Sequence, residues 1–174
     1  MVKRKYAIFF VSIILAIIIA CPTYANNSDW TRYANESNTY LRTVVSNDHV
    51  SRVIGSARGR LLSSSGLEIS NDNDGIIGVY AETLCHVGVA EINMVIYLDV
   101  WDEIQEDWVM VNEYDYNWLA EDSPNGELTD VSVSFDVVGL QKGRTYSLRA
   151  YHAARSFDNY SETMATETGG IVLE

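Results

Sequence analysis

Residues 128–138 read LTDVSVSFDVV, and apolar and polar side chains alternate strictly from residue 131 to residue 137. Val131, Val133, Phe135 and Val137 fall on one face, and two serines and an aspartate fall on the other. Because successive side chains of a strand point to opposite faces, the pattern predicts a β-strand that buries one face and exposes the other.

A second stretch, residues 92–101 (INMVIYLDVW), also places every second residue on an apolar face. The expected core residues of this strand are Ile92, Met94, Ile96, Leu98 and Val100. Alternation of this kind, interrupted by turn-forming clusters such as NDNDG (71–75) and SPNG (123–126), is typical of an antiparallel all-β domain.

Working outward from these two stretches, the pattern predicts a two-sheet β-sandwich of seven to eight strands over residues 57–174. The expected strands span residues 58–64, 66–70, 76–84, 92–101, 108–119, 128–138, 144–154 and 164–173.

The N-terminal residues have the pattern of an export signal. Three basic residues (3–5) precede an apolar run over 6–20, and Ala25 supplies a small residue at the cleavage position, so residues 1–25 are predicted to be a signal peptide. A retained membrane anchor is the alternative, although the run is shorter than the ~20 residues that cross a bilayer. A third possibility is lipidation at Cys21, since residues 18–21 (IIAC) have the form of a bacterial lipobox.

Residues 26–56 are rich in Asn, Ser and Thr and show neither a strand nor a helix period. We expect this segment to be a flexible arm or spacer, with any order confined to a short helix or strand near residues 40–45 that docks on the domain.

The chain is acidic, with 24 Asp and Glu residues against 12 Lys and Arg residues and a formal charge of -12. Removal of residues 1–25 takes away three basic residues and no acidic residue, which leaves a charge of -15. Such a field repels phosphates, so nucleic acid and anionic membrane surfaces are excluded as partners of the mature domain, and a protein or a glycan is expected instead.

Catalytic residues are sparse. Cys85 and His86 are sequence neighbours, so in a strand they point to opposite faces and cannot act as nucleophile and base. With Cys21 in the leader, Cys85 is also left without an internal disulfide partner. The remaining histidines, His49 and His152, are too scattered to predict a zinc site, and His152 is expected to be a hydrogen-bonded residue at the sandwich edge.

A cluster of carboxylates occupies the predicted hairpin between residues 99 and 107. A calcium site and a solvated acidic loop are both compatible with this crowding, and the solvated loop is the expected state. The candidate calcium ligands are Asp99, Asp102, Glu103, Glu106 and Asp107. A glycosidase would need two acids facing each other across a cleft, so a small hydrolase is the less favoured alternative.

Large aromatic side chains gather in the same hairpin. Alternation places Tyr97 and Trp101 on the outward face of their strand, where they are candidate ligand-binding residues for a glycan or a protein. In the following strand, Trp108, Met110, Tyr114 and Trp118 share the face that we expect to point into the core.

Residues 138–152 (VGLQKGRTYSLRAYH) contain Leu140, Gly143 and Tyr146 in the spacing L-x-x-G-x-x-Y. This stretch resembles the corner before strand F of fibronectin type III and other immunoglobulin-like sandwiches. The resemblance implies an immunoglobulin-like arrangement of the strands and a tyrosine corner, in which the Tyr146 hydroxyl bonds to nearby backbone.

A longer resemblance rests on residues 57–83 (ARGRLLSSSGLEISNDNDGIIGVYAET), 95–109 (VIYLDVWDEIQEDWV), 149–153 (RAYHA) and 161–173 (SETMATETGGIVL). These pieces resemble a family of small secreted proteins of Gram-positive bacteria that is classed as a domain of unknown function. The resemblance implies secretion and a β-sandwich, and it assigns no functional residue.

Taken together, these features predict an exported, non-catalytic module with a binding or structural role outside the cell or at its surface. No cofactor is expected apart from the calcium considered above, and a carbohydrate-binding module that uses exposed aromatic residues is the principal alternative.

Overall fold

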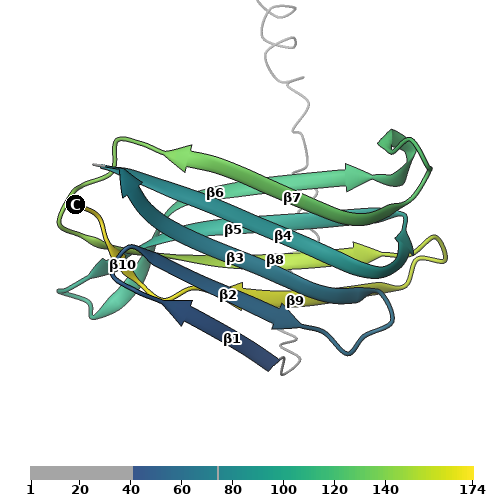
Figure 1. Ribbon diagram of the computed structural model, residues 1–174, viewed down its shortest axis with the longest axis horizontal. Coiled ribbons are helices and arrows are strands. Elements are labelled where there is room, and N and C mark those ends of the chain that lie inside the picture. The colour runs from purple at the N-terminus through teal and green to yellow at the C-terminus, as the bar shows by residue number, and fades with distance from the viewer. Residues whose placement is uncertain (1–40, 74) are drawn as a thin grey trace, which may run out of the picture.

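The computed structural model describes residues 41–73 and 75–174, which form two antiparallel sheets. The predicted signal peptide, Cys21 and the first part of the predicted arm lie outside these residues. Sheet A has the strand order β1-β2-β3-β4-β7, and sheet B has the order β10-β8-β5-β6 with β9 also paired to β8. The two sheets lie one over the other with their strands crossing at an angle (Figure 1).

Sheet A comprises β1 (Leu41–Ser46), β2 (Val50–Ser56), β3 (Leu62–Asn73), β4 (Ile76–Val89) and β7 (Leu128–Val137). Sheet B comprises β5 (Glu91–Asp102), β6 (Asp107–Leu119), β8 (Thr145–Arg155), β9 (Ser161–Glu167) and β10 (Ile171–Val172). A short 3-10 turn, Ala120–Asp122, follows β6. The predicted immunoglobulin-like β-sandwich is therefore confirmed.

The described chain has ten strands, more than the predicted seven to eight. The expected strands 58–64 and 66–70 merge into β3, which lowers the count, but the expected strand 164–173 divides into β9 and β10, and β1 and β2 form an additional hairpin that extends sheet A beyond β3. β1 matches the short docked strand that the sequence allows near residues 40–45, but the prediction of a flexible spacer is wrong over β2. Backbone pairing of β2 with β3, and of β1 with β2, supplies the order that the polar composition conceals.

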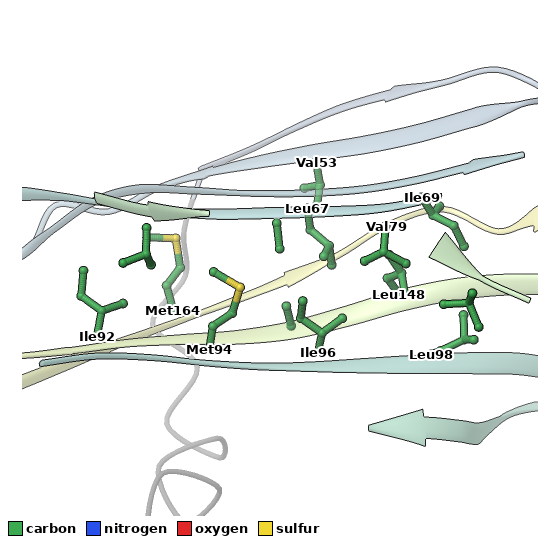
Figure 2. Close-up of a cluster of buried hydrophobic side chains, with 14 of the residues drawn as sticks. Val53, Leu67, Ile69, Val79, Ile92, Met94, Ile96, Leu98, Leu148 and Met164 are labelled. Carbon is green, nitrogen blue, oxygen red and sulfur yellow. The ribbon is translucent and has the colours of Figure 1, made fainter. Parts of the chain in front are cut away.

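The core lies between the sheets and is built from the faces predicted by alternation. Side chains of Val53, Leu67 and Val79 in sheet A point toward those of Ile96 and Leu148 in sheet B (Figure 2). Ile92, Met94, Ile96 and Leu98 are fully buried, and Val131 and Val137 of β7 are buried while Ser132 and Ser134 are exposed. These faces confirm the two strongest core predictions.

The predicted tyrosine corner is present before β8. The Tyr146 hydroxyl donates to the Gln141 carbonyl oxygen and accepts from the Gln141 amide, each at 3.0 Å, and the side chain is buried. Gly143 has a φ of 74°, a left-handed conformation that glycine adopts without steric cost. The glycine and the tyrosine of the motif together fix the path of the chain into β8.

Replacement Tyr146→Phe removes both hydrogen bonds and keeps the ring. Because a buried hydrogen bond contributes about 1 kcal/mol net, we expect the free energy of unfolding to fall by about that amount. Urea denaturation followed by tryptophan fluorescence measures the change, and an unaltered midpoint would argue against a stabilising corner.

Candidate functional site

The outer face of sheet B brings together most of the residues that the sequence singles out. Its central strand, β5, is buried along nine consecutive residues from Glu91 to Asp99, although every second side chain points away from the core. The outward side chains are covered by partners from the neighbouring strands β6 and β8 rather than by the opposite sheet.

Ion pairs with arginines of β8 bury the charged side chains that β5 turns away from the core. Arg149 holds Asp99 with two hydrogen bonds, Nε to Oδ2 at 2.5 Å and Nη2 to Oδ1 at 3.0 Å, and the Asp99 carboxylate is fully buried. Donation of these hydrogen bonds to Asp99 raises the pKa of Arg149 above its usual value. Arg155 forms the corresponding pair with Glu91 at the other end of β5. The two pairs neutralise the acidic groups that β5 turns outward.

Tyr97 lies between these pairs and is only 9% exposed. Its ring meets Tyr151 of β8 edge to face at a centroid separation of 5.9 Å, and the Arg149 guanidinium lies 5.2 Å from its ring centroid. Burial raises the pKa of Tyr97. The expected exposure of Tyr97 is therefore wrong, because side chains from β8 cover the outward face of its strand.

Trp101 and Trp108 face each other across β5 and β6, edge to face, with centroids 5.4 Å apart and ring planes at 71°. Both are half-buried. An added Cβ at Gly170 would lie 3.1 Å from Trp108 Cη2, so the glycine leaves room for the indole ring. The outward direction predicted for Trp101 is correct, but the two rings do not form a coplanar platform.

β6 contains one extra residue relative to β5. This residue turns the side chains in the first half of β6 to the opposite face of the sheet from the one that regular alternation predicts. Leu98 pairs with Asn112 and Asp99 with Met110, so Val111 is a bulge with no opposite residue. Tyr114 and Trp118 pack against the core as expected, and Tyr116 packs beside them. The ring centroids of Tyr114 and of Phe135 in β7 are 4.6 Å apart. Trp108 and Met110 instead share the face of Trp101, which corrects the prediction that they point inward.

The acidic end of the hairpin uses its carboxylates locally. Asp102 accepts the amides of Ile104 and Gln105 at 2.8 and 3.0 Å, and these bonds lower its pKa. Asp107 accepts the amide of Trp108 at 2.8 Å. With Asp99 committed to Arg149, the five candidate calcium ligands do not converge, and residues 41–73 and 75–174 contain no group of three or more potential ligands around a common point.

The same end of the hairpin exposes apolar side chains that the sequence pattern did not predict to be exposed. Ile104 is 94% exposed in the turn, and Met110 is 53% exposed on β6 beside exposed Val109 and Val111. Three consecutive exposed apolar residues are unusual for a strand at the edge of a sheet. The run VMV (109–111) is visible in the sequence, but its exposure depends on the bulge.

His152 lies inside the core and not at the sandwich edge as expected. Its ring is fully buried, with Nδ1 2.8 Å from the Thr83 hydroxyl of β4 and Nε2 2.8 Å from the Thr166 hydroxyl of β9. The ring therefore links the two sheets through hydrogen bonds. Burial lowers its pKa to about 3, so the ring is neutral at physiological pH.

Neither His152 nor Cys85 is set up for nucleophilic catalysis. Both ring nitrogens of His152 are occupied by threonine hydroxyls, and burial, followed by the charges of Glu162 and Asp130, raises the pKa of Cys85 to about 11. His49 and His86 are exposed at other positions on the surface.

Glu162 of β9 forms a contact that the sequence did not predict. Its carboxylate accepts three successive amides, those of Arg60, Leu61 and Leu62, at 2.5, 2.8 and 3.0 Å. Burial raises its pKa, but these hydrogen bonds outweigh that effect and lower the pKa overall. The contact ties the loop before β3 to sheet B across about a hundred residues of sequence, which is why no local pattern reveals it.

A scan against protein-family models finds no match to this chain, and a search of curated proteins likewise finds none. Within the part of the chain that the structure describes, no helix is long and apolar enough to cross a membrane.

The neutral state of His152 predicts a pH dependence of stability. Its pKa is about 3 in the folded protein against 6.5 for an unperturbed ring, so below pH 6.5 the unfolded chain binds the additional proton. Stability is complete above pH 6.5 and falls as the pH drops toward 3, by about 1.4 kcal/mol per pH unit. His152→Gln, which keeps hydrogen-bonding groups but does not titrate, should flatten this slope.

Urea unfolding at a series of pH values measures the slope directly. His86→Gln, at an exposed position, is the matched control and should retain the slope of the original protein. Equal slopes in the two variants would show that His152 does not govern acid sensitivity.

Asp99→Asn tests whether the buried carboxylate serves Arg149 or a cation. Loss of the pair should lower the free energy of unfolding by about 1–2 kcal/mol, a modest amount because Arg149 is partly exposed and water screens its charge. Thermal unfolding with a chelator and with millimolar calcium should give the same midpoint for the unaltered protein. A calcium-dependent rise that Asp99→Asn abolishes would instead establish a metal site.

Proposed function

We propose that this protein is an exported, non-catalytic binding module that holds a partner protein through the hairpin end, defined as residues 102–113. The observation that carries the proposal is the exposed apolar run Val109, Met110 and Val111 on an edge strand, with Ile104 exposed in the adjoining turn. Exposed apolar groups surrounded by charged residues are the usual composition of a protein-binding surface.

Three features of the described chain support a role without catalysis. The hydroxyl partners of His152 leave its ring no free nitrogen, and the raised pKa of Cys85 keeps its thiol protonated at neutral pH. The most buried carboxylate, Asp99, is neutralised by Arg149. A group that is already paired is a poor nucleophile, base or acid.

A glycan is the less supported ligand. Sugar rings stack on flat, accessible aromatic faces, whereas Tyr97 is buried and Trp101 meets Trp108 edge to face. A partner protein makes fuller use of the apolar side chains of the hairpin end.

The proposed site of action is outside the cell or at its surface. This part of the proposal rests on the basic and apolar leader of residues 1–25, with Cys21 as the alternative point of attachment to a lipid. The acidic charge of the domain repels it from anionic surfaces. The apolar hairpin end is then the surface through which the domain binds its partner.

A pair of double variants tests the proposed function. Ile104→Ser with Met110→Ser removes apolar groups from the hairpin end, and Val138→Ser with Phe157→Ser removes other apolar groups that are more than half exposed elsewhere on the surface. Immobilised proteins are incubated with the extracellular proteins of the producing cells, and the retained protein is then purified and titrated by calorimetry. We expect the hairpin variant to weaken binding about tenfold or more and the control variant to leave it unchanged.

Equal binding by both double variants would contradict the proposal. A glycan array that gives binding abolished by Trp101→Ala, with no protein partner retained, would support the carbohydrate-binding alternative instead.

A further inference from the structure

The outer edge of β6 is open over its first half. In the described chain β6 pairs with β5 on one side only, and its later residues, including Tyr114 and Tyr116, close against Phe135 of β7. Residues 107–113 lie before this aromatic closure and pair only with β5. A sheet edge of this kind presents unpaired amides and carbonyls to another chain.

The direction of these backbone groups follows from the register. The amide of Trp108 donates to the Asp107 carboxylate at 2.8 Å, which places this amide on the open side of the strand. Because backbone groups alternate along an antiparallel strand, the amide and carbonyl of Met110 point to the open side as well. The bulge at Val111 comes after Met110 and does not alter this orientation.

The charge around this edge selects the partner. Residues 102–113 contain five acidic residues and no lysine or arginine. Glu103, Glu106, Asp107 and Glu113 are exposed. Two copies of this chain paired edge to edge would place like charges together, which destabilises strand pairing. A partner that carries basic residues gains the opposite sign of interaction.

We infer, resting on the proposed function of the hairpin end, that the edge of β6 between Asp107 and Glu113 receives an extended segment of the partner protein as an additional strand of sheet B. The segment alternates apolar residues with lysine or arginine. Its backbone bonds to the open groups of Met110, its apolar side chains pack beside Met110 and Trp108, and its basic side chains meet the carboxylates of the hairpin end.

Two single variants separate backbone pairing from side-chain contact. Met110→Pro removes the outward amide, and an edge strand tolerates proline where the amide faces solvent. Met110→Thr keeps the amide and removes the long apolar side chain. The probe is the synthetic peptide acetyl-Lys-Val-Arg-Val-Lys-Val-Arg-Thr-amide, titrated by calorimetry against the full chain and each variant.

We expect the peptide to bind the unaltered protein, with affinity reduced about tenfold or more by Met110→Pro and about threefold at most by Met110→Thr. The same peptide methylated on alternate backbone nitrogens should bind about tenfold more weakly, and a version with glutamate in place of the basic residues should not bind. If Met110→Pro fails to fold, as judged by circular dichroism, the methylated peptide carries the test alone.

Several results would overturn the inference. The methylated peptide binding as well as the plain peptide would show adsorption by charge alone, and equal losses in both Met110 variants would show that only the side chain matters. Absence of peptide binding, while the hairpin double variant still loses its partner protein, would reject strand addition and leave the proposed function standing. A concentration-dependent dimer that Met110→Pro abolishes would identify a second copy as the occupant.

Discussion

Burial of β5 on both of its faces is the constraint on which the rest of the structure depends. Its inward side chains pack against sheet A, and its outward charged groups, such as Glu91 and Asp99, are each held by an arginine of β8. A slip of one residue would move these carboxylates into the core and the apolar side chains outward. The ion pairs therefore add to the core packing in fixing the register of sheet B.

Because the register of β5 is fixed by its core packing and its ion pairs, the neighbouring strand β6 can accommodate a bulge without shifting β5. The extra residue at Val111 divides the aromatic and apolar side chains of β6 into two groups. Tyr114 and Tyr116 close the side of the sandwich against β7, while Trp108 and Met110 turn to the outer face beside an unpaired edge. The binding surface proposed for the hairpin end is thus a direct consequence of one inserted residue.

Properties that depend on local alternation could be predicted from the sequence, and properties that depend on distant partners could not. The core faces of β5 and β7 follow from alternation, the tyrosine corner follows from the resemblance of residues 138–152 to immunoglobulin-like sandwiches, and all three are present. The burial of Tyr97 depends on Tyr151 and Arg149, more than fifty residues later in the chain. The bulge at Val111 leaves no mark in composition. β2 is ordered by pairing with β3, and β1 by pairing with β2, rather than by an apolar pattern of their own.

Native-state hydrogen exchange tests most directly whether β5, which is paired on both sides, lies next to an unpaired edge of β6 in sheet B. The amide of Ile96 lies in the interior of β5, which is paired on both sides, and should exchange only through global unfolding. The amide of Met110 should exchange within about tenfold of the rate of an unstructured peptide, because no described strand covers it. Protection of the Met110 amide comparable to that of Ile96 in the free protein would mean that the edge is already covered, and it would contradict this account.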